Sequence, residues 1–253
     1  MKYSIEAACG CHNGKIRANN EDNFLFNNTS LMLEHNGLKN PVYMDGPVHW
    51  RLIFAVFDGM GGENFGEIAS FRAASCLKRE EKKIQSFFTP EKKYLKEVCN
   101  KMNEEVYLAA QEQSTEHMGT TMASLFFTPL SVYACNVGDS RAYRLREGEF
   151  LQISQDHVEK RPDGNTKKAP LTQYLGVDPN EIMIEPYVVK GELKRGDVYL
   201  LCSDGLTDMV SNFDICDILL KHEDVVDCVD SLKSAAIENG GRDNITVIVC
   251  KIV

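Results

Sequence analysis

No run of apolar residues in this sequence is long enough to cross a membrane as a helix, which takes about 20 such residues in a row. The first six residues also lack the apolar core of a signal peptide. Positive charge is in the minority, since 28 lysines and arginines stand against 37 aspartates and glutamates, and the net charge is −9. This balance disfavours binding to nucleic acid or to an anionic membrane surface. We therefore expect a cytoplasmic protein with no nucleic-acid partner and no membrane partner.

The nine cysteines include no C-x-x-C pair, and their number is odd. A zinc ribbon or a thioredoxin-like redox site is therefore not indicated. Cys135, Cys202 and Cys250 stand inside apolar runs of strand length. Small buried residues in a reducing compartment account for such cysteines.

The chain shows no repeat, no low-complexity tract and no linker, so we expect residues 1–253 to form a single domain. Apolar and alternating patterns predict strands at 4–9, 23–26, 51–57, 120–127, 131–137, 141–146, 149–153, 182–189, 198–202 and 244–253. Apolar residues spaced by threes and fours predict helices at 63–80, after Pro90, at 213–220 and at 225–237. Residues 27–50 and 156–170 carry the turn signals of loops.

The spacers between consecutive strands are short. Thr128-Pro129 and Glu147-Gly148 have the composition of hairpin turns. Strands joined by hairpins form antiparallel sheets and not a doubly wound parallel one. We therefore expect an α+β fold in which antiparallel sheets pack together with helices outside.

Carboxylates recur where the predicted strands end. Asp58, Asp139, Asp204 and Asp243 each follow or precede an apolar strand beside a glycine or another turn-forming residue, and Asp22 comes just before a strand. One Asp-Gly pair alone is also the commonest hairpin turn. Several carboxylates on one rim repel each other unless a cation neutralises them. Oxygen ligands without histidine or cysteine indicate Mg²⁺ or Mn²⁺ and not zinc.

Arg17 lies five residues before Asp22. Its planar, permanently charged guanidinium suits a phosphate group. On its own, the residue would be an ordinary surface arginine. Next to a carboxylate-rich rim it becomes a candidate phosphate ligand.

These motifs follow one another in the order of a known family. They are GKIRANNED (14–22), VFDGMGG (56–62), GEIAS (66–70), GTT (119–121), NVGDSRAY (136–143), Asp156-His157, LTQYLG (171–176), LCSDGL (201–206) and DNITV (243–247). The sequence resembles the PPM, or PP2C-like, metal-dependent protein serine/threonine phosphatases, especially the small bacterial members. The resemblance implies a sandwich of two antiparallel β-sheets flanked by helix pairs.

The resemblance also implies a metal centre. Asp58 would bridge two Mn²⁺ or Mg²⁺ ions, and the Gly59 carbonyl would be a further ligand. Asp204 and Asp243 would hold the first metal, and Asp22 the second, directly or through water. A hydroxide bridging the two ions would then attack the phosphorus of phosphoserine or phosphothreonine.

Three further roles follow from the resemblance. Arg17 would bind the phosphate, and with Asp58 and Asp204 it forms the expected catalytic set. Asp139 and Asp204 would bind a weaker third metal. The expected partners are phosphorylated proteins and a serine/threonine kinase acting on the same substrates, and a monomer is expected.

The sequence departs from the family pattern at several positions. Met60 stands where many eukaryotic members have a histidine that is proposed as the general acid, and Glu63 stands where bacterial relatives tend to have another. His157 is the remaining motif histidine, with either a catalytic or a loop-orienting role. The segment 158–170, beside the expected active site, is short and basic, whereas the loop 27–50, which ends at the only tryptophan, is long. Substrate choice is therefore the property that can least be inferred for this sequence from the family.

Two other functions stay open at this point. The chain could be a catalytically weak module that senses a partner or a metal, although it keeps every expected aspartate and Arg17. It could also hydrolyse small phosphate esters, because metal chemistry does not dictate the substrate. A cysteine phosphatase is not indicated, because Cys11 and Arg17 are six residues apart but no glycine-rich phosphate cradle connects them.

Overall fold

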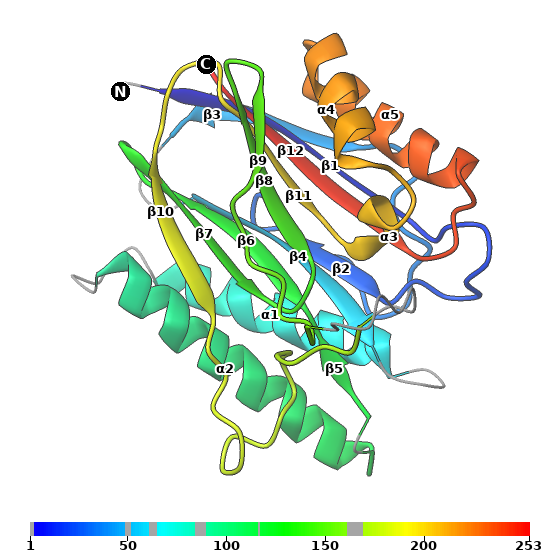
Figure 1. Ribbon diagram of the computed structural model, residues 1–253. Coiled ribbons are helices and arrows are strands. Elements are labelled where there is room, and N and C mark those ends of the chain that lie inside the picture. The colour runs from blue at the N-terminus through cyan, green and yellow to red at the C-terminus, as the bar shows by residue number, and fades with distance from the viewer. Residues whose placement is uncertain (1–2, 49–51, 61–64, 84–89, 116, 161–168) are drawn as a thin grey trace.

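The computed structural model describes residues 3–48, 52–60, 65–83, 90–115, 117–160 and 169–253. These residues form two antiparallel β-sheets that pack face to face, with helices on both outer sides (Figure 1). The predicted α+β class and the antiparallel sandwich are therefore confirmed.

Each sheet combines strands that are distant in sequence. In spatial order, the first sheet consists of β3 (Val42–Pro47), β1 (Ser4–His12), β12 (Ile245–Ile252), β11 (Val198–Cys202), β8 (Arg141–Arg146) and β9 (Glu149–Gln152). The second consists of β10 (Tyr187–Glu192), β7 (Ser131–Val137), β6 (Met122–Phe127), β4 (Leu52–Met60) and β2 (Asp22–Leu25), and β5 (Gly119–Thr120) pairs with the end of β4. The last strand, β12, lies between β1 and β11, so the two ends of the chain meet in the first sheet.

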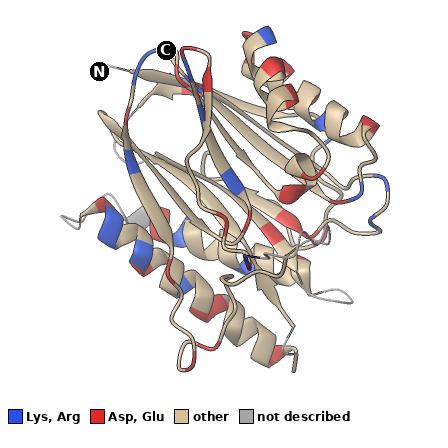
Figure 2. Cartoon of the chain, in the orientation of Figure 1, with Lys and Arg blue, Asp and Glu red and all other residues tan. Residues whose placement is uncertain are grey.

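The core between the sheets is built from alternate residues of each strand. On β4, Phe54 and Val56 face the first sheet, whereas Ile53, Ala55 and Phe57 face the helices on the other side. This is the period of two expected of a strand, with both faces buried. Few charged residues occur within the strands of the second sheet (Figure 2).

Aromatic rings connect the two sheets across this core. The ring of Phe127 on β6 contacts Phe54 at 6.0 Å between centroids and Tyr199, on β11 of the other sheet, at 5.7 Å. Both contacts are edge-to-face, the arrangement that aromatic quadrupoles favour.

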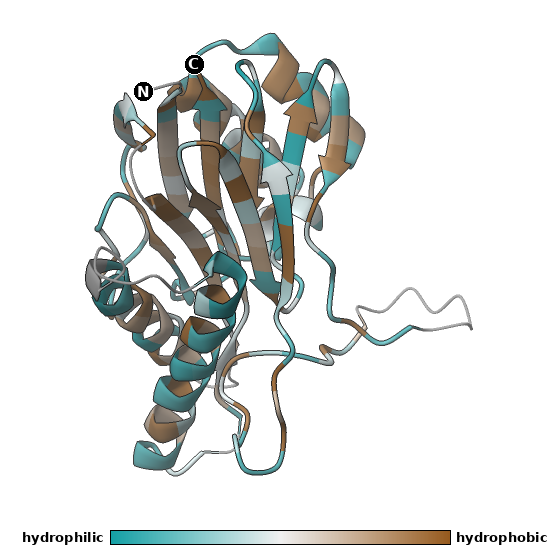
Figure 3. Ribbon diagram, turned by 90° about the vertical axis from the view of Figure 1, so that its left-hand side faces the viewer, coloured by the Kyte–Doolittle hydropathy of each residue, from teal (hydrophilic) through white to brown (hydrophobic). Residues whose placement is uncertain are grey.

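A helix pair covers the outer face of each sheet. Helices α1 (Gly66–Lys83) and α2 (Glu91–Glu112) cover the second sheet, and α4 (Asn212–Lys221) and α5 (Val225–Glu238) cover the first. The side chain of Ser211 caps α4, and that of Asp224 caps α5, by accepting free amide hydrogens of the first turn. The outward faces of the helices are mostly hydrophilic (Figure 3).

Three segments differ from the prediction. The loop expected over 27–50 contains β3, an edge strand whose exposed and half-buried residues alternate and which is recognised only through its pairing with β1. The strand expected over 182–189 begins five residues later, at Tyr187, where pairing with β7 begins. The strand expected to stop at Asp58-Gly59 continues to Met60, because β2 and β5 pair with its end.

Some predicted features lie outside the described residues. They are Trp50, Glu63 and three of the four basic residues of the segment 158–170, namely Arg161, Lys167 and Lys168. Among the helices that the structure describes, none combines the length and the hydropathy needed to span a membrane.

Candidate active site

The predicted carboxylates lie at strand ends that meet at one end of the sandwich. Asp22 begins β2 and stands directly opposite Asp58 on β4. Asp204 follows β11, and Asp243 precedes the neighbouring strand β12, so antiparallel pairing places both at the same edge of the first sheet. Asp139 follows β7. In Figure 2 the acidic segments at the ends of β2 and β4 lie close to the short helix α3 (Asp204–Thr207). The fold therefore gathers residues separated by more than 200 positions.

Asp22 is the most deeply buried of these acids, with 1% of its surface exposed. Its Oδ2 accepts hydrogen bonds from Ser203 Oγ at 2.8 Å and from Thr246 Oγ1 at 2.7 Å. Burial raises the pKa of the Asp22 carboxyl to about 7. The two hydrogen bonds come from neutral donors and offset only part of the loss of hydration. A carboxylate in such a place is stabilised as an anion by a nearby cation.

Asn244, beside Asp243, ties the N-terminal segment to the first sheet. Its Oδ1 accepts the backbone N–H of Glu21 at 2.7 Å, and its Nδ2 donates to the carbonyls of Asn13 and Asn19, both at 3.0 Å. Gly205 approaches the Asn244 carbonyl so closely that a Cβ could not fit. These contacts hold the loop that carries Arg17 against the segment before β12, which carries Asp243.

The backbone around Asp58 and Gly59 is tightly held. The Asp58 carbonyl accepts the N–H of Thr121 and the hydroxyl of Thr120, both at 2.9 Å. Gly59 donates its N–H to the Glu21 carbonyl at 3.1 Å. A Cβ on Gly59 would collide with the carbonyls of Glu21 and Gly66, so only glycine fits here.

Arg17 reaches the same end of the molecule from an exposed loop. Its Nη2 pairs with Asp243 Oδ2 at 2.7 Å, and about half of its side chain stays exposed. The hydrogen bond that Arg17 donates to Asp243 raises the pKa of the guanidinium above its ordinary value. Exposed pairs of this kind are weak, typically about 0–1 kcal/mol. An incoming phosphate can therefore compete with Asp243 for the guanidinium.

His157 holds the loop of Asp139. Its Nδ1 accepts the N–H of Gly138 at 3.1 Å, and its backbone N–H donates to the Gly138 carbonyl at 3.0 Å. Burial lowers the pKa of His157, so its ring is mostly neutral near pH 7. Gly138 has a φ of +98°, which explains the glycine directly before Asp139. Of the two roles left open for His157, these contacts favour loop orientation.

The carboxylates share one end of the sandwich without forming a closed ligand shell. In the part of the chain that the structure describes, no group of three His, Cys, Asp or Glu side chains is gathered closely enough to hold a metal ion. One reason why the ligand shell is not closed is that the Asp243 side chain is hydrogen-bonded to Arg17. Ligation by Asp243 therefore requires this ion pair to exchange. Mutual repulsion of uncompensated carboxylates also keeps these side chains apart.

Ser203, Asn244 and Thr246 lie within the sequence motifs, but the motifs alone predict no role for these three residues. In the structure the two hydroxyls hold Asp22, and the amide holds the Arg17 loop. The available signal was their position, because each lies within three residues of a predicted acidic ligand. Which atoms they reach depends on contacts more than 180 residues apart in sequence.

Comparisons with known proteins identify the family of the chain. The family model described as protein phosphatase 2C matches residues 43–237. The serine/threonine phosphatase stp of Listeria innocua is 31% identical over 252 residues, which cover 93% of this chain and 91% of that protein. Protein phosphatase PhpP of Streptococcus pneumoniae is 29% identical, over 78% of this chain and 84% of the relative.

Solved structures show the same likeness. The crystal structure of the Mycobacterium tuberculosis serine/threonine phosphatase PstP/Ppp matches with a TM-score of 0.78 and 27% identity over 98% of both chains. The catalytic domain of PstP in complex with two manganese ions matches with the same TM-score and identity over 99% of both. The chain therefore belongs to the protein phosphatase 2C family.

Proposed function

We propose that this protein hydrolyses phosphoserine and phosphothreonine on protein substrates with the help of two Mn²⁺ or Mg²⁺ ions. The observation that carries the proposal is the buried Asp22, which stands opposite Asp58 at the end of the sandwich where Arg17 also lies. Membership of a protein phosphatase family supports the activity. The manganese ions named for the PstP catalytic domain support the choice of metal.

The residues at this end fit hard divalent cations. Asp204 and Asp243 would hold the first ion, and Asp22 the second, directly or through water. Asp58 would be a ligand of both ions, and the Gly59 carbonyl would be a further ligand. All of these donors are oxygens, which Mg²⁺ and Mn²⁺ prefer. A cation there would also stabilise the buried anion of Asp22. When bound, the two ions lower the pKa of a water molecule and neutralise charge on the phosphate.

Three further residues at this end would have different roles. Arg17 would exchange Asp243 for the phosphate oxygens, since its fork of N–H donors suits both. Asp139, on the loop that His157 holds, would join Asp204 in binding a third, weaker ion. Met60 offers no proton, so the protein side chain at this position does not supply the acid for the leaving group.

We also propose that residues 1–253 act as one domain, because the core between the sheets takes residues from both halves of the chain. A cytoplasmic monomer that opposes a serine/threonine kinase is the corresponding cellular role. Light scattering after size-exclusion chromatography tests the monomer, and a mass above that of one 28.4 kDa chain would contradict it.

Removal of the metal tests the proposal directly. We expect phosphate release from a phosphothreonine peptide in Mn²⁺ and in Mg²⁺, and none with excess chelator, because the protein side chains alone do not activate water. Restoring the metal should restore the rate. Turnover that survives the chelator would contradict the metal-dependent reaction. Bound metal without turnover would favour the sensing module, and faster turnover of free phosphate esters than of phosphopeptides would favour a small-molecule phosphatase.

A second prediction concerns the hydroxyl that holds Asp22. Thr246→Val keeps the shape of a fully buried side chain and removes one of the two donors to Asp22 Oδ2. We expect the Mn²⁺ concentration needed for half-maximal activity to rise about 10–100-fold, the range seen when a group that orients a metal ligand is lost. Ser124→Ala also deletes a buried hydroxyl, in a strand of the second sheet, and serves as the control. An unchanged metal requirement in the Thr246 variant would show that Asp22 needs no such support.

A further inference from the structure

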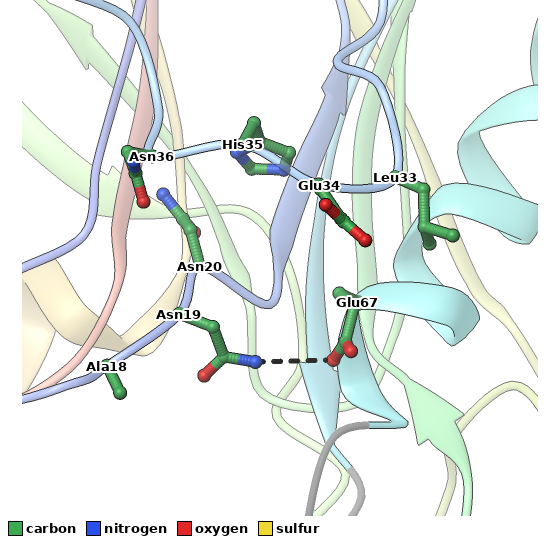
Figure 4. Close-up of a pocket in the computed structure, with 8 residues that line it drawn as sticks. All are labelled: Ala18, Asn19, Asn20, Leu33, Glu34, His35, Asn36 and Glu67. Atoms are coloured by element: carbon green, nitrogen blue, oxygen red, sulfur yellow. Dashed lines mark hydrogen bonds between the residues drawn. The ribbon is translucent and has the colours of Figure 1, made fainter.

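A pocket of about 390 Å³ lies beside the proposed phosphate site. Its walls come from the segment before β2, from the loop between β2 and β3, and from the first turn of α1 (Figure 4). The polar residues that line it are Asn19, Asn20, Glu34, His35, Asn36 and Glu67. Two of its three walls, the loop between β2 and β3 and the first turn of α1, contain no residue assigned to catalysis. The first of these walls belongs to the long loop over 27–50 that distinguishes this sequence.

The lining of this pocket carries negative charge only. Glu34 and Glu67 both line it, and in Figure 4 their carboxylates lie on facing walls. Asn19 Nδ2 donates to Glu67 Oε2 at a long 3.4 Å. Among the described residues, neither glutamate has a lysine or arginine partner, and Arg17 is engaged with Asp243. The pocket is therefore complementary to a positive charge brought by a ligand.

The shape and chemistry of the lining favour an organic cation over a metal ion. No three metal-binding side chains converge here or elsewhere in the described chain. In Figure 4 the amide groups of Asn36 and Asn20 lie on the side away from the carboxylates of Glu34 and Glu67, and Asn19 lies next to Glu67. Amide and carboxylate oxygens spread over a pocket match the several N–H donors of a guanidinium, or those of an ammonium group.

The pocket shares a wall with the reaction centre. Asn19 and Asn20 connect Arg17, the proposed phosphate ligand, to Asp22 at the metal site. The Asn20 carboxamide accepts the N–H of Asp22 at 3.1 Å. Adjacent residues of an extended peptide advance by about 3.5 Å, so a long side chain within three positions of the phosphorylated residue can reach this wall.

From this placement we propose that the pocket is a specificity site that binds the arginine or lysine side chain of a phosphoprotein substrate, within about three residues of the phosphorylated one. The proposal rests on the phosphatase function proposed above and adds a substrate preference to it. Glu34 is the residue that tests the proposal, because it is exposed, lines the pocket and is not among the residues assigned to catalysis or metal binding.

The test uses the intact protein with Mn²⁺ and a set of phosphothreonine peptides. In the parent peptide alanine occupies the three positions on each side of the phosphothreonine, and each other peptide has one of these alanines replaced by arginine. We expect arginine at one or more positions to raise kcat/KM about fivefold to tenfold, as one charge-assisted interaction in a partly exposed site would do. Phenyl phosphate, which has no flanking residue, measures the chemistry alone.

Three variants assign the effect to the pocket. Glu34→Gln should reduce the preference for arginine and Glu34→Lys should remove it, with hydrolysis of phenyl phosphate unchanged in both. Glu192→Gln makes the same change of charge as Glu34→Gln at an exposed residue, at the end of β10 that lies away from the active site. This variant should keep the preference for arginine. The proposal is overturned if no position favours arginine, or if Glu34→Lys keeps the preference. Loss of the preference alone leaves the phosphatase function standing, whereas no turnover of any substrate by the unaltered protein would remove both.

Discussion

Asp204→Asn is expected to reduce metal-dependent phosphate release by about a thousandfold or more, since a direct metal ligand should matter more than the groups that orient one. Asp204 is 7% exposed and begins α3, which is separated from the end of β11 by Ser203 alone. Asparagine has the same shape and no charge, so the change removes the anionic ligand proposed for the first and third ions and leaves the backbone in place. The measurement is kcat/KM for a phosphothreonine peptide over a range of Mn²⁺ concentrations.

A matched control separates this effect from a general loss of negative charge. Asp45→Asn makes the same substitution at an exposed position of the edge strand β3 and should retain full activity. Thermal unfolding without metal should be similar in both variants and the parent protein. If Asp204→Asn retained more than about a tenth of the activity, Asp204 would not be an essential ligand and the proposed metal set would need revision.

Arg146→Met is expected to lower the free energy of unfolding by about 3–5 kcal/mol, the cost of leaving a buried charge without its partner. Asp197 is 1% exposed and receives Arg146 Nε and Nη2 at 2.6 Å each. The remaining donors are neutral: the N–H of Lys194 at 2.9 Å and the hydroxyl of Tyr199 at 3.0 Å. Chemical denaturation measures the loss, and the melting temperature should fall by about 10 °C.

The same variant should remain active once folded. Arg146 is the last residue of β8, a strand that begins near the catalytic end of the sandwich and finishes at the other. Activity per folded molecule at low temperature should therefore match that of the parent. Arg195→Met, at an exposed arginine in the same region, should change stability by less than about 0.5 kcal/mol. A loss below 1 kcal/mol for Arg146→Met would mean that water reaches Asp197 and replaces the guanidinium.

The prediction from sequence was accurate where the local pattern and the tertiary environment agree. Strand β7 is buried along its full length, and its bounds are those predicted. The turn at Glu147-Gly148 was also predicted correctly, because both residues adopt a positive φ as a tight hairpin requires. The prediction failed at β3, where partly exposed residues and Gly46-Pro47 carry loop signals and only pairing with β1 creates the strand.

The sequence by itself determined which residues could form a metal and phosphate site. Carboxylates beside glycines at strand ends, together with Arg17, have no simpler collective explanation than a divalent cation and a phosphate, because oxygen donors and guanidinium select for both. The ordered motifs also indicated the family, which the comparisons confirm.

Only the tertiary structure decided which partners these residues have. The pairing of Asp22 with Ser203 and Thr246, and the pocket formed by the segment before β2, the long loop and α1, join parts of the chain that are distant in sequence. Local patterns report the burial and periodicity of one segment at a time. Contacts between segments depend on how the two sheets pack, and that packing is a property of the whole chain.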